Sequence, residues 1–357
     1  MSGFDILTER LGIRLPIIQA PMAGTSSPAL AAAVSAAGGL GSLGVAAAGA
    51  EGAARMIAET RARSDGPLNV NVFCHRPGIA DPAVEAAWIA RFTPEFERLG
   101  AAPPQRLTAI YKSFLEDDAM LRLLLEARPA VVSFHFGLPS EAAISALRGA
   151  GITLFGSATC LAEAKALARA GVDMIVAQGW EAGGHRGMFD PAAPDDRLGV
   201  LPLTRLLARE SGLPVIAAGG IMDGAGIAAA LRLGAVAAQL GTAFVGCDES
   251  LADDGYRAAL ASDAAHHTVM TRAISGRPAR CLANRFTALA ATVPDAAMPA
   301  YPMAYDLGKA LNAAGKARGE TGFGAQWAGQ GAPLSRPMPA AALVRTLAGE
   351  LAAAHHG

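Results

Sequence analysis

Cysteine is scarce in this chain of 357 residues, and neither sign of charge is in excess. The four cysteines show no C-x-x-C spacing, which argues against a dense disulfide framework and a structural zinc site; they are Cys74, Cys160, Cys247 and Cys281. Thirty basic residues against 31 acidic ones give a net charge of -1, and no window combines Lys and Arg with interleaved aromatics, so nucleic acid is not an expected partner. These absences favour a reducing compartment and a small neutral or singly charged substrate.

Long apolar runs are also missing. The Ala-rich stretches are broken by Gly, Pro or charge before they reach about 18 residues. Residues 1–5 lack the basic segment and the following apolar run of a signal peptide. We therefore expect a cytoplasmic protein with no membrane partner, and the sequence leaves a homo-oligomer open. Because 52% of the residues are hydrophobic and 17% are charged, a sizeable core is expected.

Short apolar runs alternate with Ala- and Leu-rich segments of helical length, which is typical of parallel βα units. Eight such runs are expected strands, at residues 17–20, 40–43, 68–73, 131–134, 153–155, 174–177, 215–218 and 237–240. Helices are expected between them at 28–37, 119–127, 141–148, 161–170, 203–210 and 225–233. The count of eight predicts an α/β fold of the (β/α)8 TIM-barrel type.

Two stretches interrupt this alternation. The gap between the third and the fourth expected strand exceeds an ordinary connection. Residues 77–110 and 247–320, the second with a helix expected at 304–314, therefore form a predicted helical lid or substrate domain over the mouth of the barrel. Residues 1–76, 111–246 and 321–357 are assigned to the barrel, with a last helix at 338–351.

A histidine in glycine-rich, flexible backbone follows the sixth expected strand, in the segment QGWEAGGHRG at residues 178–187. Ligands of such folds bind at the carboxyl ends of the strands. Glycine beside His185 allows close approach of backbone N–H groups to a ligand, and imidazole can transfer a proton near neutral pH. His185 is the candidate catalytic residue; on this segment alone, a solvated loop histidine is an equal alternative.

Two glycine turns follow the seventh and eighth expected strands, where barrels of this type frequently bind phosphate. The N–H groups of Gly220 and Gly241 and the hydroxyl of Thr242 are the predicted donors, aided by a short following helix; the alternative is a pair of tight turns. No Walker lysine follows, which favours flavin mononucleotide (FMN) over a hydrolysed nucleotide. The G-x-G-x-x-G match at residues 39–44 is discounted because it closes a helix instead of opening one.

Taken together, the motifs resemble the nitronate monooxygenases of the bacterial class I type, formerly called 2-nitropropane dioxygenases. The matching segments are QAPMAG at 19–24, VNVF at 70–73, SFHFG at 133–137, the histidine segment at 178–187, AGGI at 218–221, QLGT at 239–242 and WAGQG at 327–331. The resemblance runs nearly end to end. It implies a TIM barrel with a small, mainly helical second domain and a non-covalent FMN.

The same resemblance implies roles by position. It places His185 at the active site and assigns FMN contacts to Met22, Asn71, Gln178, Gly183, Gly220, Gln239, Leu240, Gly241 and Thr242. It assigns the substrate pocket to His135, Tyr111, Tyr256, Tyr301, Tyr305 and Lys309. Amide side chains suit the flavin edge because they donate and accept hydrogen bonds. Strand-end or core packing stays open for the two amides that end strands, for His135 and for the tyrosines.

Lys309 follows Tyr305 by four residues, so a helix would place both on one face. Its ammonium group could attract a substrate carboxylate, such as that of propionate 3-nitronate. No metal is expected, because no third ligand stands at a recognisable spacing from the histidines.

The reaction implied is oxidation of an alkyl nitronate by O2 to a carbonyl compound and nitrite, without NAD(P)H. Two alternatives remain open. An FMN-dependent enoyl-ACP reductase shares the barrel and a similar histidine loop, and it would need NADH. A flavin-binding protein without turnover would tolerate loss of His185.

Overall fold

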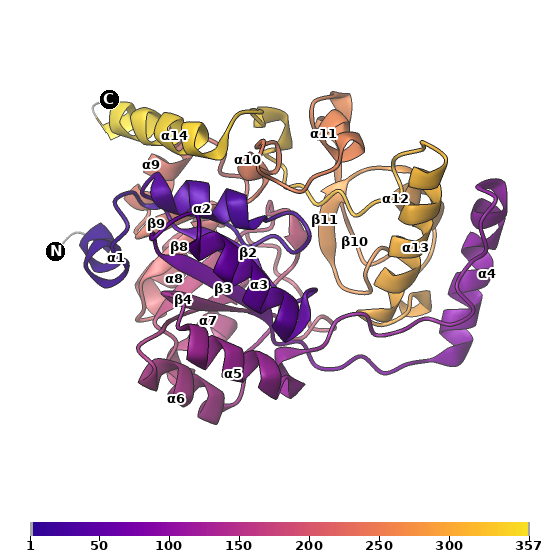
Figure 1. The fold of residues 1–357 in the computed structure, drawn as a ribbon, viewed down its shortest axis with the longest axis horizontal. Helices are drawn as coiled ribbons and strands as arrows, with labels where there is room; N and C mark the ends of the chain where they lie inside the picture. Colours follow the sequence, from indigo (N-terminus) through magenta and orange to yellow (C-terminus); the bar gives the residue numbers. More distant parts are fainter. Residues whose placement is uncertain (1–2, 356–357) are drawn as a thin grey trace.

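The computed structural model describes residues 3–355, and its centre is a parallel β-barrel (Figure 1). Every pair of neighbouring strands is parallel, in the order β1-β9-β8-β6-β5-β4-β3-β2, and a bridge between Ile18 and Leu40 brings the two end strands together. All eight predicted strands are confirmed. They are β1 (Ile17–Gln19), β2 (Gly41–Gly44), β3 (Leu68–Phe73), β4 (Val131–His135), β5 (Thr153–Ala158), β6 (Met174–Gln178), β8 (Val215–Ala218) and β9 (Ala237–Leu240).

Helices surround this barrel (Figure 1). They are α2 (Pro28–Ala36), α3 (Gly49–Arg61), α5 (Asp118–Ala127), α6 (Glu141–Gly149), α7 (Leu161–Ala170), α8 (Val200–Glu210), α9 (Gly224–Arg232) and α14 (Ala340–His355). Several begin where the sequence supplies a cap: the side chains of Ser27, Ser140 and Asp223 each accept a backbone N–H of the first turn. Such a cap is worth about 1 kcal/mol. Gly171 ends α7 in the left-handed conformation, with φ of 84°.

The short helix α1 (Gly3–Leu11) covers the amino-terminal end of the barrel. Its Leu7 and Leu11 are buried in the cluster that fills the barrel interior, together with Phe155 and Ile216. This end is therefore filled by packed side chains. A cavity lies at the opposite end, where the carboxyl ends of the strands open.

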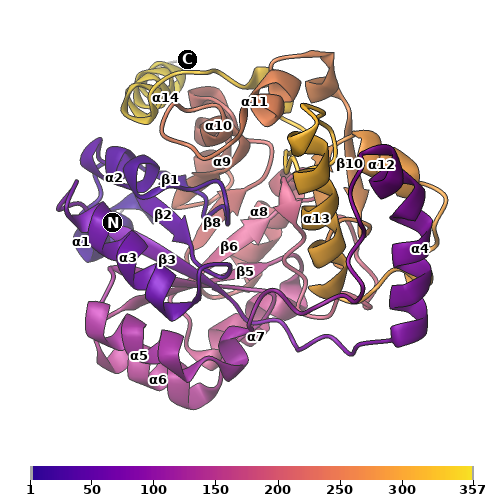
Figure 2. The same cartoon turned by 45° about the vertical axis from the view of Figure 1, so that its right-hand side comes forward.

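A second lobe is built from two segments far apart in the sequence, and both views place them side by side (Figures 1 and 2). One carries α4 (Pro82–Arg98), and the other carries α11 (Asp254–Leu260), α12 (Arg285–Ala290) and α13 (Met303–Ala317). Trp88 and Phe92 of α4 share a buried cluster with Phe286 of α12, and the rings of Phe92 and Phe286 stack at 4.9 Å. Both segments therefore contribute helices to one lobe.

The lobe is not built from helices alone. It also contains β10 (Thr268–Thr271) and β11 (Ala279–Leu282), which form an antiparallel sheet with the two-residue strand β7 (Gly184–His185). These strands are at most four residues long and are held by pairing across the sheet, so no local pattern marks them. The sheet joins the histidine segment to the second lobe.

The remaining short elements are α10 (Thr242–Val245), η1 (Phe114–Glu116), η2 (Asp263–His266), η3 (Asp295–Ala297) and η4 (Ala332–Leu334). Within residues 3–355, no helix is both long and apolar enough to cross a bilayer. The barrel assignment also included residues 1, 2, 356 and 357, which lie outside the described part of the chain.

Candidate active site

A cavity opens at the carboxyl ends of the barrel strands and extends under the second lobe. The empty space at this end is about 1320 Å³ when the open solvent at its mouth is included, and both polar and apolar residues line it. Of the residues predicted to contact FMN, the cavity is lined by Met22, Asn71, Gln178, Gly183, Gly220, Gln239, Gly241 and Thr242. Leu240 is the exception, since its side chain is buried in a hydrophobic cluster around β9 and does not line the cavity.

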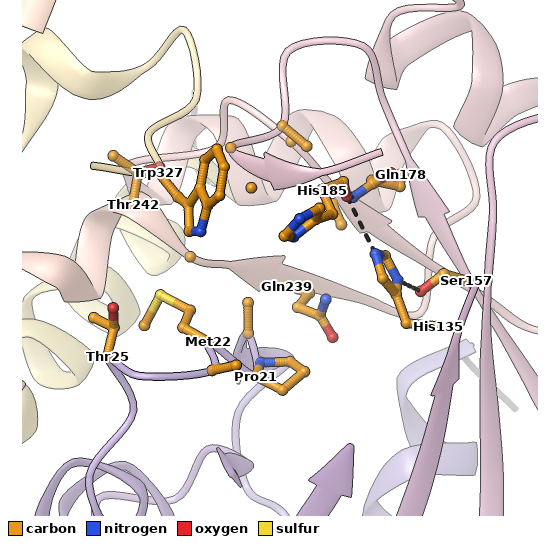
Figure 3. Close-up of a pocket in the computed structure, with 18 of the residues that line it drawn as sticks. Pro21, Met22, Thr25, His135, Ser157, Gln178, His185, Gln239, Thr242 and Trp327 are labelled. Carbon is orange, nitrogen blue, oxygen red and sulfur yellow. Dashed lines mark hydrogen bonds between the residues drawn. The ribbon is translucent and has the colours of Figure 1, made fainter. Parts of the chain in front are cut away.

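The backbone of His185 is held from three sides, contrary to the flexible loop that its glycines suggested. His185 is paired with Ala279 of β11, and the next N–H, that of Arg186, donates to the carbonyl of Pro278 at 2.8 Å. The carbonyl of His185 accepts a hydrogen bond from Gln178 Nε2 at 2.9 Å (Figure 3). Gln178, predicted to contact FMN, therefore also fixes the histidine.

The His185 imidazole has one nitrogen engaged by protein. Its Nε2 lies 2.9 Å from the hydroxyl oxygen of Ser275, which in turn lies 3.2 Å from the carbonyl oxygen of Arg277. When the Ser275 hydroxyl donates to that carbonyl, Nε2 must carry the hydrogen, and Nδ1 keeps its lone pair. Burial, together with His135 and the Arg277 guanidinium, holds the pKa of His185 well below its usual value. The ring is therefore neutral at pH 7.

His135 also lines the cavity, but both of its ring nitrogens are occupied. Nδ1 lies 2.9 Å from the Ser157 hydroxyl oxygen, and Nε2 lies 3.1 Å from the His185 carbonyl oxygen (Figure 3). Burial lowers the pKa of His135 to about 4. This arrangement positions the backbone of His185 and leaves no free His135 nitrogen for a substrate.

The predicted tyrosines and lysine divide into two groups. Tyr111, Tyr256 and Tyr305 line the cavity, and burial keeps their hydroxyls protonated, raising the pKa of Tyr305 to about 12. Tyr301 and Lys309 do not line it. Tyr301 packs behind the catalytic candidate, with its ring 5.5 Å from that of His185. Lys309 is exposed, and its Nζ lies 4.8 Å from the centre of the Tyr111 ring.

The polar groups of the cavity fit FMN. Within the described residues the side-chain amide of Gln239 makes no hydrogen bond, and it lies in the cavity (Figure 3). Asn71 Nδ2 donates to the carbonyl and the hydroxyl of Ser133, which leaves Oδ1 as an acceptor for a ring N–H. At the other end, Gly220 has a φ of 67° and the short helix α10 begins directly after Gly241, as predicted for a phosphate site.

Comparison with known proteins agrees with this geometry. A family profile described as "Nitronate monooxygenase" matches residues 5–350. A nitronate monooxygenase from Paraburkholderia phytofirmans is 63% identical over 350 residues, which cover 98% of this chain and 96% of that protein. The chain belongs to the nitronate monooxygenase family. It is thus an oxidoreductase of the monooxygenase type.

Two further relatives extend this similarity. A nitronate monooxygenase from Pseudomonas aeruginosa is 56% identical over 97% of this chain and 99% of its own length. The solved nitroalkane oxidase from Streptomyces ansochromogenes is 40% identical, superimposes with a TM-score of 0.89, and covers 98% of this chain and 99% of its own. The barrel and its second lobe are therefore shared along nearly the whole length.

Three residues of this nitronate monooxygenase site received no role from the sequence. Ser157 and Ser275 hold the two histidines, and Trp327 lines the cavity with its ring 5.0 Å from that of His185. Trp327 had a visible signal, because it opens the WAGQG segment and is one of three tryptophans. The serines had none. Within the described residues, no group of three or more His, Cys, Asp or Glu side chains could hold a metal ion.

Two glycines that line the cavity, Gly183 and Gly241, are expected to respond differently to alanine. A Cβ on Gly183 would lie 2.5 Å from the backbone nitrogen of Gly329, whereas one on Gly241 would meet the Ala20 Cβ at an ordinary 3.5 Å. We expect Gly183→Ala to destabilise the protein by about 1–3 kcal/mol and to weaken FMN binding. Gly241→Ala keeps its N–H and should do neither. Urea unfolding and FMN titration measure both; equal behaviour of the two variants would contradict this packing account.

Proposed function

We propose that this protein uses non-covalent FMN to oxidise alkyl nitronates with O2, giving a carbonyl compound and nitrite without NAD(P)H. The observation that carries the proposal is an imidazole, fixed by Ser275, at the wall of a cavity whose lining amides and glycine turns suit FMN. When bound, FMN would accept electrons from the substrate and react with oxygen. The family membership supports the same reaction.

The residues of the chain would then divide the work of binding. Asn71 and Gln239 would hold the isoalloxazine edge, with Met22 beside the ring. Gly220, Gly241 and Thr242 would hold the phosphate end, and Gly183 would line the cavity beside them. The Thr242 hydroxyl already accepts the N–H of Gly329 at 3.0 Å, so its own hydrogen is available to a phosphate oxygen.

His185 would face the nitronate. A nitronate is already an anion, so the first step needs no strong base, and a neutral imidazole with a depressed pKa is suited to that substrate. Nδ1 has no protein partner among the described residues and would be the ring atom that meets the substrate, while Ser275 fixes the ring orientation through Nε2. Tyr305 of helix α13 and Tyr111 line the cavity with their rings in contact. Together they would shield the reaction from water.

Oxygen uptake by the purified, FMN-loaded protein tests this proposal. With propionate 3-nitronate and no NADH, we expect oxygen consumption and nitrite formation in proportion to the enzyme added. NADH should change neither rate. A yellow protein that is inert toward nitronates but oxidises NADH would overturn the proposal and favour the reductase reaction instead.

A further inference from the structure

Trp327 contacts both His185 and two of the tyrosines that line the cavity, Tyr256 and Tyr305. The indole lies on the wall next to His185, across the cavity from Met22 and Pro21 (Figure 3). Its ring centre is 5.0 Å from that of His185, at an interplanar angle of 57°. A side chain this large, next to the catalytic candidate, limits how much room a substrate has there.

The indole is fixed through both its side chain and its backbone. The Tyr305 ring meets the Trp327 indole edge-to-face with ring centres 6.1 Å apart, and its hydroxyl lies near enough to the Trp327 and Tyr111 side chains for both to lower its pKa as hydrogen-bond partners. Because an indole can only donate, Tyr305 must accept the N–H of Trp327. The Tyr256 hydroxyl donates to the main-chain carbonyl of Trp327. These phenols are thus engaged with Trp327 and with one another.

The chain on both sides of Trp327 is anchored as well. The N–H of Gly329 donates to the Thr242 hydroxyl at 3.0 Å, and the N–H of Gln330 donates to the Glu181 carbonyl at 2.9 Å. The indole therefore stands on a segment that is tied to the predicted phosphate end of the site. A smaller side chain at position 327 should therefore enlarge the cavity, because the anchored backbone cannot move inward to fill the space.

We propose that Trp327 is the residue that determines which alkyl nitronates this enzyme accepts, and that Tyr305 and Tyr256 act by positioning Trp327. This inference rests on the proposed function, since it names the substrate class of the same site. The indole sets the space beside His185 for the alkyl group, and the two phenol hydroxyls keep it there. The tyrosine hydroxyls are therefore not the direct ligands of the nitronate oxygens.

The first test is selectivity for chain length. We expect Trp327→Leu to raise kcat/KM for hexyl nitronate relative to ethyl nitronate by tenfold or more, since each buried methylene is worth about a fourfold factor. Trp180→Phe, a tryptophan outside the cavity lining, is the matched control and should keep the wild-type ratio. A ratio for Trp327→Leu within twofold of the wild type would overturn the proposal.

The second test separates positioning from direct binding by a double-mutant cycle. Trp327→Phe removes the indole N–H, so Tyr305→Phe should change KM and selectivity in the wild-type background but not in the Trp327→Phe background. Additive effects would show that the Tyr305 hydroxyl binds the substrate itself, and would overturn the positioning role. Tyr256→Phe should shift selectivity in both backgrounds, because the carbonyl of residue 327 is present in each.

Binding of the same nitronates to the FMN-loaded protein without oxygen, followed by flavin absorbance, keeps the two proposals distinguishable. If wild-type protein binds nitronates but does not turn them over, the proposed function fails. A shift of binding toward longer chains in Trp327→Leu would then still support the role of Trp327 in substrate selection. If turnover occurs but chain length has the same effect on binding to wild type and to Trp327→Leu, the selectivity role of Trp327 is refuted and the proposed function stands.

Discussion

Replacing His185 with asparagine is expected to lower kcat/KM for nitronates by about 10²- to 10⁴-fold, the usual contribution of a positioned acid–base group. His185 is the one imidazole of the cavity wall with a ring nitrogen left free by its protein partners, because both nitrogens of His135 are engaged. The substitution removes that nitrogen from the site. FMN binding should persist, since the residues that would hold the flavin are left in place. Steady-state oxygen uptake and the visible spectrum measure the two effects separately.

His267→Asn provides the control for this variant. His267 is exposed and lies outside the cavity lining, so the same substitution there should leave kcat/KM within about twofold. If His185→Asn kept its FMN and also kept wild-type turnover, the catalytic role of His185 would be refuted. The remaining interpretation would then be a flavoprotein in which this histidine is only structural.

The barrel could be predicted from the sequence because its signals are local. Each strand is a short apolar run before a helix, and each run buries its side chains within one parallel sheet. Val215–Ala218 and Ala237–Leu240 have the predicted bounds for this reason. The glycine turns after them could also be placed, because the order of strands in a barrel fixes which loops are neighbours.

The surroundings of His185 could not be predicted in the same way. The pairing of β7 with β11 joins residues 94 and 96 positions apart, and the strands of this sheet are too short to show a pattern. Ser275 reaches His185 through that pairing, so its role has no sequence signal. Likewise, a match by position does not show which way a side chain points. The resemblance named Tyr301 and Lys309 as pocket residues, but the fold places both outside the cavity lining.

A loss of stability between pH 6.5 and 4 is the second large effect that we expect. Burial, aided by the Arg277 guanidinium, lowers the pKa of His75 to about 4, and burial lowers the pKa of His135 to the same value. In the unfolded chain both groups return to about 6.5. Above pH 6.5 neither state binds the protons, so stability is complete there. As the pH falls below 6.5, only the unfolded chain binds them, which costs the folded state up to roughly 3 kcal/mol for each histidine at pH 4.

His75→Phe isolates one of these contributions. His75 is 1% exposed and its ring packs at 4.9 Å from Tyr301, so a phenyl ring keeps the shape and removes the titrating group. Urea unfolding at pH 7 and pH 4.5, with saturating FMN at both, should show a smaller acid-induced loss of unfolding free energy in the variant than in the wild type.

Ion-paired carboxylates cannot produce this difference between the two proteins. Hydrogen bonds with Arg98 and Arg285 lower the pKa of Glu320 to about 2, for example, so the stability from that group is lost only between its unfolded value near 4.5 and about 2. Parallel losses in the two proteins would mean that His75 is already protonated in the fold at pH 4.5, and that its burial does not exclude the charge.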